Sequence, residues 1–516
     1  MPRKWKHAGG GGSQAARQLA TVLISATLAF VAYAAFFPVP GGGGASGGLY
    51  QRWRCQGSAS RRSGGDDDGA AGVARAPTSL SHIVFGIGGT ARTWAHRRGY
   101  VELWWRPGVT RGHVWLDEEP PRPWPAATSP PYRVSADASR FGRRATASRM
   151  ARIVADAFAL AAAAAAANGT GKDAGGEVRW FVMGDDDTVF FPDNLVAVLR
   201  RYDHEQAYYV GAPSETAAQD MLHSYGMAFG GGGFAVSYPA AAELAGAIDG
   251  CLDRYRDLFG SDERVHACLS ELGIPLTREP GFHQLDLRGD ASGLLAAHPV
   301  APLVSLHHLD LIHPISPHGR TPLDAVRSLV DAAQLDPARS LQQAFCYHRH
   351  DGGGYNWSVS VAWGYAAQLY PWAVPAHQLE VPLQTFTAFR GRPDGPFLFK
   401  TRPWRPDDAC ARPVTFFLSH ARNETDGATT AAAATVTEYS RHAGGKSPEK
   451  ECDKPSFRPA AAVQTVMVVA PKMSPADWER APRRHCCETA WTTPGSVLEV
   501  RIGRRCRGGE LTASTP

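Results

Sequence analysis

Three consecutive carboxylates, Asp185, Asp186 and Asp187, directly follow the apolar segment VRWFVM at residues 178–183. The segment has the composition of a buried strand, and carboxylates at the end of such a strand are costly unless they meet a cation or a water-filled cleft. In open α/β sheets, that end of a strand is where ligands bind. Two or three carboxylates there suit a hard divalent ion that bridges phosphates, such as Mg²⁺ or Mn²⁺. The alternative is an acidic turn that caps the next helix.

A second run of three aspartates shows that this interpretation depends on context. Asp66, Asp67 and Asp68 have the same letters, but they lie in a Gly-rich stretch with no strand before them. We interpret this second run as solvated acidic residues that carry no chemistry.

A glycine run and a histidine pair follow further along the chain. Four glycines occupy residues 230–233. Glycine lets a backbone approach a ligand closely, although a flexible turn would explain the run equally well. His307 and His308 follow the short apolar segment 304–306. Successive side chains of a strand point to opposite faces, so the pattern predicts that at most one histidine faces any given cleft. The alternative is a hydrogen-bonded core histidine.

An acidic pair, Asp262 and Glu263, follows Ser261 at the start of a predicted helix. Acids in the first turn of a helix are ordinary partners of its dipole, so the pair alone indicates no chemistry. The helix amino terminus favours the ionised form, which would keep a general base deprotonated but would also lower its basicity.

The segments around these residues alternate between strand and helix patterns. The strand candidates are HIVFGI (82–87), HVWL (113–116) and VRWFVM (178–183). The helix candidates are an Ala-rich segment at 149–167, a segment capped by Asp193 and reaching Tyr202, one opened by Pro239 and one closed by Gly273. This alternation predicts a layered α/β domain over residues 79–320.

A β-rich pattern replaces it over residues 321–516. Strand patterns include Trp357, Val359, Val361 and Trp363 in alternation, the triplet Leu498, Val500 and Ile502, and the segments VTFFL and VQTVMVV. Six of the nine cysteines lie here and none of the nine forms a C-x-x-C pair, which favours disulfides over zinc. We expect a disordered insert near 424–450. The region shows no catalytic pattern, and bracing the first domain is favoured over binding sugar.

Residues 19–37 form an uncharged apolar run, which at about 1.5 Å per residue spans about 28 Å of bilayer. Four basic residues precede the run and none follows until Arg52, so the positive-inside rule places the amino terminus in the cytosol and the remainder in the lumen. We expect a cytosolic tail at 1–17, a signal anchor at 18–38 and a flexible stem at 39–78. A cleaved signal peptide is the alternative, although its apolar core is usually shorter. N-glycosylation sequons at Asn168, Asn356 and Asn423 agree with a lumenal chain.

Charge and composition exclude two classes of protein. The 516-residue chain has a net charge of +5, but residues 1–65 hold eight basic and no acidic residues, so the remainder sums to −3. A nearly neutral body argues against general nucleic-acid binding, which needs a basic face. A hydrophobic content of 44% excludes a wholly disordered chain.

One alternative function comes from Gly86, Gly88 and Ala91, which match the G-x-G-x-x-A fingerprint of dinucleotide-binding folds. The fingerprint requires a helix that starts near Gly89 and an acid about 20 residues further on. Asp117 lies at the far edge of that spacing. A membrane-anchored lumenal enzyme would be an unusual user of nicotinamide, so this alternative is not favoured.

Taken in order, the motifs resemble a known family. They are a W-rich helix after the first strand, DDD at 185–187, GGGGF at 230–234, SDE at 261–263, FH at 282–283 and SLHH at 305–308. This order resembles the Fringe-type β1,3-glycosyltransferases, and most closely the plant Fringe-related group, formerly a domain of unknown function. The resemblance covers roughly residues 80–320, and NWSVSVAWGY at 356–365 looks like the extension typical of the plant group.

The resemblance implies a GT-A fold, a Rossmann-like α/β sheet that binds a nucleotide sugar. It implies Mn²⁺ as cofactor, held by Asp187 and His307, with Asp185 and Asp186 near the ribose and metal-bound water. It assigns substrate binding to the glycine loop and matches the catalytic base to Asp262 or Glu263. The loop glycines concerned are Gly231, Gly232 and Gly233. The chain departs from the Fringe pattern with Ser261 for Pro, Glu263 for Asp, and GGGG for GGAG, so the acceptor of Fringe is not carried over.

The activity implied is that of an inverting, metal-dependent hexosyltransferase in the Golgi membrane, a single-pass type II protein with a lumenal catalytic domain. Its partners would be a nucleotide-sugar donor and a glycan or glycoconjugate acceptor, joined by a β1,3 linkage. The alternative is a catalytically inactive lectin-like or scaffolding protein on the same fold. The aspartates and His307 favour the enzyme, because a binding protein needs no metal at a leaving group.

Overall fold

The computed structural model describes residues 76–167, 177–350, 355–424, 434–442, 452–455, 457–479, 482–491 and 496–503. Residues 75–516 form one compact unit. The predicted anchor at 18–38 and the predicted stem up to residue 75 lie outside the described residues.

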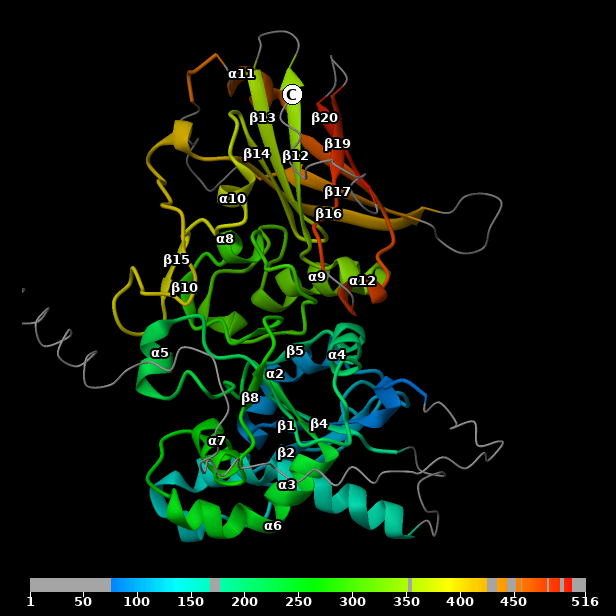
Figure 1. Ribbon diagram of the computed structural model, residues 1–516, viewed down its shortest axis with the longest axis vertical. Coiled ribbons are helices and arrows are strands. Elements are labelled where there is room, and N and C mark those ends of the chain that lie inside the picture. The colour runs from blue at the N-terminus through cyan, green and yellow to red at the C-terminus, as the bar shows by residue number, and fades with distance from the viewer. Residues whose placement is uncertain are drawn as a thin grey trace, which may run out of the picture. The chain divides into compact units, whose positions relative to one another are not determined.

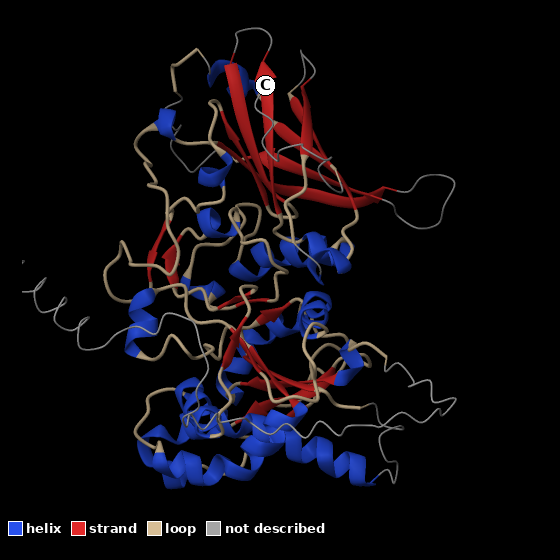
Figure 2. Cartoon of the chain, in the orientation of Figure 1, coloured by secondary structure: helices blue, strands red, loops and turns tan. Residues whose placement is uncertain are grey.

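A seven-stranded sheet forms the centre of the first half of this unit (Figures 1 and 2). Its order is β3-β2-β1-β4-β7-β6-β8. Neighbouring strands from β3 to β4 are parallel, and β7 is antiparallel to both of its neighbours. The strands are β1 (Ile83–Gly88), β2 (Arg111–Leu116), β3 (Tyr132–Val134), β4 (Trp180–Asp185), β6 (Tyr209–Gly211), β7 (Phe234–Ser237) and β8 (Leu276–Arg278). The mixed α/β class predicted for this region is confirmed.

Helices cover both faces of the sheet, as Figure 1 shows. One face carries α3 (Ala145–Ala167), α6 (Tyr238–Arg254) and α7 (Ser261–Glu271), and the other carries α2 (Ala91–Glu102) and α4 (Pro192–Leu199). Alternate strand residues enter the two cores, with Phe85 and Val182 on the α2 side and Val84 and Phe181 on the α3 side. Because both faces of these strands are buried, their sequences are continuous apolar runs.

One described helical stretch, Ser139–Ala167, is long and apolar enough to cross a membrane. It includes α3, whose Ile153, Val154 and Ala157 are buried against the sheet. We therefore interpret it as a core helix of the α/β layer.

Helix α4 differs in detail from the expectation. Pro192 occupies its first turn and Phe191 is the N-cap, so Asp193 is not the cap. Proline is favoured at the first helical position because its missing N–H is not needed there. The Asp193 carboxylate instead pairs with Arg106 at 2.6 Å. The helix ends at Leu199, so Tyr202 lies beyond it.

Two small sheets accompany the large α/β sheet. The first contains β5 (Val189–Phe190), β11 (Ser305–Leu306) and β9 (Phe282–His283). The second pairs β10 (Leu287–Gly289) with β15 (Phe386–Ala388). The remaining described α-helices are α5 (Ala217–Leu222), α8 (Ser292–Leu295), α9 (Pro322–Leu335), α10 (Ala376–Leu379), α11 (Phe457–Ala462) and α12 (Ala476–Glu479).

An eight-stranded sheet dominates the last third of the chain, in the order β12-β13-β14-β16-β17-β18-β20-β19. Pairing is antiparallel except between β18 and β20. The predicted face of Trp357, Val359, Val361 and Trp363 is fully buried. The strands are β12 (Gln343–His350), β13 (Tyr355–Ala362), β14 (Ala366–Tyr370), β16 (Val414–Glu424), β17 (Ala434–Arg441), β18 (Thr465–Pro471), β19 (Cys487–Trp491) and β20 (Val497–Ile502).

The prediction of a disordered insert at 424–450 is wrong for the middle of that segment. Residues 434–441 form β17, which pairs with β16 and β18 inside the sheet and buries Val436 and Tyr439. The neighbouring strands supply the hydrogen bonds that this polar segment lacks by itself. Residues 425–433 and 443–450 lie outside the described part.

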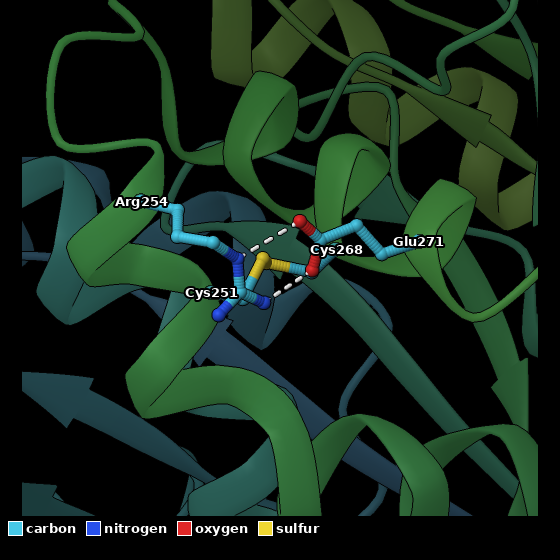
Figure 3. The surroundings of a disulfide bond; sticks show 4 residues. All are labelled: Cys251, Arg254, Cys268 and Glu271. Carbon is cyan, nitrogen blue, oxygen red and sulfur yellow. Dashed lines mark hydrogen bonds and ion pairs between the residues drawn. A yellow bond between two sulfur atoms is a disulfide. The ribbon is translucent and has the colours of Figure 1, made fainter.

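Three disulfides join cysteines that both lie within the described residues, and Cys486 is disulfide-bonded as well. Cys346 of β12 and Cys487 of β19 join the two edge strands of the eight-stranded sheet. Cys410 pairs with Cys452, and Cys251 of α6 pairs with Cys268 of α7 (Figure 3). These pairs confirm the preference for disulfides over zinc for the cysteines concerned.

The predicted boundary at residue 320 is crossed by contacts. One hydrophobic core joins Leu195 and Leu306 to Ala362, Tyr365 and Phe417. The β10–β15 pair also links the two regions. The division into 79–320 and 321–516 therefore remains a proposal that rests on the change from α/β to β-rich pattern.

Candidate functional site

The three aspartates form a tight turn between β4 and β5. The Thr188 backbone N–H donates to the Asp185 carbonyl at 3.1 Å, and the Asp185 N–H donates to the Thr188 hydroxyl at 2.8 Å. Asp186 and Asp187 are buried, whereas the Asp185 side chain is 37% exposed. The turn lies at the carboxyl ends of the parallel strands, as the sequence predicts for a ligand site.

His307 reaches this turn because β11 pairs antiparallel with β5, with Leu306 opposite Val189. Its Nε2 lies 3.1 Å from Asp187 Oδ1 and 3.8 Å from Asp185 Oδ2. Each of the three residues offers a ligand atom within 4.8 Å of the others, and no other such group occurs among the described residues. His307 is therefore brought to the aspartates from more than 100 residues away.

The chemistry of this group fits a divalent cation. Asp187 Oδ1 is buried and makes no hydrogen bond, despite its proximity to His307. A buried carboxylate oxygen without a hydrogen bond is costly, and a cation would satisfy it. Carboxylate and imidazole ligands together suit Mn²⁺. The structure shows a site that a metal can occupy and does not identify the metal.

The electrostatics of the three residues are strongly coupled. Burial lowers the pKa of His307, but the Asp187 and Asp185 carboxylates outweigh burial and raise it to about 9. Burial tends to raise the pKa of Asp187, yet the charge of His307 brings it below its ordinary value. Partial loss of hydration, together with the neighbouring Asp187 and Asp186 carboxylates, raises the pKa of Asp185, although its side chain remains partly exposed. A bound cation and the proton on His307 would therefore compete for the same carboxylates.

The glycine run is held in place against His307. A β-carbon at Gly231 would overlap the His307 ring. The Thr188 hydroxyl donates to the Gly231 carbonyl at 2.7 Å, and the Gly232 N–H donates to Gln284 Oε1 at 2.6 Å. These contacts argue against a flexible turn. The run ends at Gly233, whose φ of +85° lies in the left-handed region that favours glycine.

The same run leads to the acidic pair at the start of α7. The Gly230 N–H donates to Asp262 Oδ2 at 3.2 Å. Glu263 is engaged otherwise, because its carboxylate accepts from the Gly260 N–H at 2.9 Å and lies 2.7 Å from His223 Nδ1. Asp262 therefore faces the glycine run, while Glu263 caps the helix.

The pKa values of the two carboxyls move in opposite directions. Burial raises the pKa of Asp262, despite hydrogen bonds from Gly230 and Glu263. Burial also acts on Glu263, but hydrogen bonds from Gly260 and His223 lower its pKa. From the sequence alone, the helix terminus is expected to reduce the basicity of Asp262. Burial outweighs that effect and raises the pKa of Asp262 above its ordinary value.

Three side chains on α2 also reach the site, and sequence reasoning missed them. Thr93, Arg97 and Tyr100 recur at i, i+4 and i+7, so they share one helix face. Arg97 Nη1 lies 3.2 Å from a carboxylate oxygen of both Asp186 and Asp187. The Thr93 hydroxyl donates to Asp186, and the Tyr100 hydroxyl donates to Asp310 at 2.5 Å. The helical spacing indicates that these three residues share a face, but not what that face contacts.

The expectation that His307 and His308 face opposite sides is wrong. Their ring centroids are 3.9 Å apart. The strand ends at Leu306, and His308 adopts a left-handed backbone with φ +53°, so the alternation of a strand no longer applies. His308 Nδ1 lies 3.1 Å from Asp286 Oδ1, which anchors the second ring beside the first.

The two glycines that match the dinucleotide fingerprint have a structural role in this fold. A β-carbon at Gly86 or Gly88 would overlap side chains on and around α3, so both glycines serve helix packing. Helix α2 begins at Ala91, with Thr90 as its N-cap. The Ala91 N–H already donates to the Asp117 carboxylate at 2.8 Å, at the position that a bound phosphate would need.

Comparison with known sequences identifies the family. The family described as "Protein of unknown function, DUF604" matches residues 219–487. The chain belongs to the DUF604 family. A second family, described as "Fringe-like", matches residues 140–293 of this DUF604 protein. That range contains the three aspartates, the glycine run and Asp262, but it ends before His307.

A curated human protein named "Beta-1,3-glucosyltransferase" is 32% identical to this DUF604 protein over 108 residues. The match covers 21% of each chain, so the DUF604 protein spans about a fifth of the relative's length. These similarities link part of the chain to Fringe-like proteins and to a glycosyltransferase.

Proposed function

We propose that this DUF604 protein is a metal-dependent, inverting glycosyltransferase with a GT-A fold. It would move a sugar from a nucleotide-sugar donor to a hydroxyl of a glycan or glycoconjugate, forming a β1,3 linkage. The similarity to Fringe-like proteins and to a β1,3-glucosyltransferase supports the reaction class. The parallel strands β3-β2-β1-β4, with the aspartates at their carboxyl ends, support a nucleotide-binding sheet.

One observation carries the proposal. Asp185, Asp187 and His307 converge as a cation site, and the glycine run connects this site to Asp262. A binding protein has no need for a metal site and a half-buried carboxylate that contact the same glycine run. A transferase needs both, because its leaving group gains negative charge while its acceptor loses a proton.

The residues of the chain then take separate roles. Asp187 and His307 would hold the metal, and Asp185 and Asp186 would serve the ribose and the water around the metal. Mn²⁺, when bound, supplies Lewis-acid stabilisation of the diphosphate leaving group. Asp262 accepts the proton of the acceptor hydroxyl, and Glu263 keeps the helix start in position. Gly231, Gly232 and Gly233 would contact the donor sugar through their backbone only, because the space of their missing side chains is taken by His307, Gln284 and Phe190.

Arg97 adds a further cation to this arrangement. Its guanidinium contacts Asp186 and Asp187 and its side chain is 38% exposed, so it remains accessible to a ligand. In the donor complex it would turn from the aspartates to the diphosphate, whose charge it matches. This role was not part of the sequence-based expectation.

We also propose the cellular setting that the sequence predicts. The protein would be a single-pass type II protein of the Golgi membrane, of the plant Fringe-related group, anchored by residues 18–38. Protease added to intact microsomes should then spare almost the whole chain, and enzymatic removal of N-glycans should increase its mobility in electrophoresis. Digestion of the β-rich region without detergent would contradict this topology.

The experiment that tests the function measures nucleotide binding by thermal shift, with and without Mn²⁺, over a panel of nucleoside diphosphates and nucleotide sugars. Ligand at a hundred times its dissociation constant should add about 2.7 kcal/mol of stability. Asp187→Ala and His307→Ala should each abolish the Mn²⁺-dependent shift, and Asp67→Ala should not change it. Unchanged nucleotide affinity in Asp187→Ala would contradict a metal-bound diphosphate. Glycan binding without any nucleotide shift would favour the lectin-like alternative.

A further inference from the structure

A segment from the β-rich region reaches the candidate site. Strand β15 pairs with β10, and Phe389 follows β15 directly. The Phe389 N–H donates to the Asp286 carbonyl at 2.9 Å, and its ring centroid is 5.7 Å from that of His308. Since His308 lies 3.9 Å from His307, Phe389 is the third ring in a row that begins at the cation site.

Two guanidinium groups lie over this third ring. Arg288 of β10 is 5.1 Å from the Phe389 centroid, and Arg390 is 5.3 Å from it. Both arginines are exposed. Within the described ranges, neither has a carboxylate within the 4 Å of an ion pair. The result is a pair of accessible, uncompensated positive charges.

The acidic residues nearest to Arg288 in sequence are already engaged, and among the described residues Asp394, the nearest to Arg390, forms no ion pair with it. Asp286 contacts His308 and accepts from the Ser214 hydroxyl at 2.7 Å. Asp290 accepts from both the backbone N–H and the hydroxyl of Ser292, each at 2.8 Å. The arginine pair is thus left for an anion from outside the chain.

The loop that carries Arg390 is ordered by its own hydrogen bonds. The Ala388 N–H donates to the Pro393 carbonyl and the Gly395 N–H to the Arg392 carbonyl, each at 3.0 Å. Gly391 has φ +85° and lies against Ala218 of α5, where a β-carbon would be 3.0 Å away. Figure 1 shows β10, β15 and α5 on the same flank of the structure. The arginines therefore sit on a preformed platform, which lowers the entropic cost of binding.

The position of the pair separates it from the donor. Arg97 contacts the aspartates directly, whereas no contact links Arg288 or Arg390 to the aspartates in the described chain. A diphosphate held at Asp187 and His307 would be served by Arg97. The ring contacts that link the arginine pair to His307 pass through Phe389 and His308, so we assign the pair to another part of the bound substrates.

We propose that Arg288 and Arg390, held on the Phe389 ring, form an acceptor subsite for an anionic group. The chemical class is an acidic glycan that carries a carboxylate, sulfate or phosphate. Guanidinium groups bind such oxyanions through paired, charge-assisted hydrogen bonds. The acceptor role rests on the proposed function, whereas anion binding rests on the arginine pair alone.

The test measures binding of fluorescent oligosaccharides to the full chain at low salt by anisotropy, without donor. The probes are tetragalacturonate, a sulfated galactose oligosaccharide and a phosphorylated mannose oligosaccharide, each with its methyl-esterified, desulfated or dephosphorylated counterpart. A charge-assisted hydrogen bond predicts about tenfold tighter binding of at least one acidic probe than of its counterpart. The probe that shows this preference identifies the anionic group. Equal affinity within all three pairs would overturn the proposal.

Variants of Arg288 and Arg390 test whether these two residues cause the preference for acidic probes. Arg288→Gln and Arg390→Gln should each reduce it about tenfold without changing affinity for the neutral probes. Arg390→Lys, which keeps the charge, should retain part of the preference for the acidic probe. A partial preference in this variant would show that substitution at residue 390 leaves the loop folded. Arg143→Gln, which removes an exposed guanidinium in another part of the chain, should retain all of the preference. A preference that survives in both Arg→Gln variants would overturn the assignment to this pair.

The oligosaccharide-binding test and the nucleotide-binding test of the proposed function can succeed or fail independently. An arginine-dependent preference for acidic glycans without Mn²⁺-dependent nucleotide binding would refute the transferase and keep the anion site. Nucleotide binding without the preference would refute the subsite alone.

Discussion

Gly231 lies directly against the imidazole of His307, so that a β-carbon at this position would overlap the ring. The contact joins two motifs that are far apart in the sequence, the glycine run and the histidine that faces the aspartates. It makes the absence of a side chain at residue 231 a condition for the cation site.

Gly231→Ala should therefore abolish Mn²⁺ binding while the protein still folds, because the new methyl group displaces His307 from Asp187. Calorimetric titration with Mn²⁺ measures the loss directly. The matched control is Gly246→Ala on α6, where a β-carbon would meet nothing within 4 Å. Alanine in that helix should raise stability by about 0.5–1 kcal/mol and leave Mn²⁺ binding unchanged. Normal Mn²⁺ affinity in Gly231→Ala would remove His307 from the set of ligands.

Asp262→Asn should reduce sugar transfer by about 10²–10⁴-fold, the usual loss when a general base is removed. Nucleotide binding should stay near the parental value, because the metal site is not altered. Burial raises the pKa of Asp262, so the parental transfer rate should increase with pH until this carboxyl is ionised. Steady-state rates at several pH values provide the measurement.

Glu263→Gln is the matched comparison for Asp262→Asn. It weakens the contact with His223 and the cap on the Gly260 N–H, so it should lower stability rather than the rate of transfer. Parental transfer in Asp262→Asn together with its loss in Glu263→Gln would move the base to Glu263. Full activity in both variants would place the base elsewhere.

The Cys251–Cys268 disulfide clamps α7, the helix that begins with Asp262, to α6 (Figure 3). The two cysteines are 17 residues apart, and closing a loop of that size is worth about 3 kcal/mol in the chain-entropy model. The double variant Cys251→Ser/Cys268→Ser should lose that amount of unfolding free energy, measured by chemical denaturation.

The ion pair beside this disulfide provides the control. Arg254 Nε donates to Glu271 at 3.0 Å, and the Arg254 side chain is 55% exposed. Exposed ion pairs contribute little to stability, so Arg254→Ala should cost clearly less than loss of the disulfide. Equal costs for the two changes would contradict a clamping role for the disulfide.

Asp220 on α5 should make stability depend on pH. Burial raises its pKa to about 7, from an ordinary value of 3.8. The folded state therefore holds a proton that the unfolded state releases between about pH 4 and pH 7, so stability falls as pH rises through that range. A tenfold difference in proton affinity between the folded and unfolded states corresponds to about 1.4 kcal/mol of stability.

Asp220→Asn removes this titration, so its free energy of unfolding should change less than that of the parent between pH 4 and pH 8. The stability of the variant relative to the parent should therefore increase as the pH rises from 4 to 8. Denaturation midpoints at both pH values measure the effect. Asp257→Asn, at an exposed position, should follow the parental profile. Parallel profiles for Asp220→Asn and the parent would show that Asp220 is ionised throughout.

Much of the first half of the fold could be predicted from the sequence because its signals are local. The apolar run before Asp185 forms β4, Pro239 lies in the first turn of α6, and Gly273 takes a positive φ of +74° after α7. Each of these features depends on the geometry of a few neighbouring residues. The order of the motifs also allowed Asp185, Asp187 and His307 to be assigned to one site before any contact was known.

The sequence by itself determined which residue types are available for chemistry and in which elements they lie. Tertiary structure alone decided that Arg97 faces the aspartates, that His308 turns beside His307, and that Phe389 extends the row of rings. It also decided that residues 434–441 form a strand, since β16 and β18 supply their hydrogen bonds. The spacing of apolar residues along a helix or strand indicates which of its positions are buried. The partner of a side chain depends instead on how elements distant in sequence pack, which local pattern does not encode.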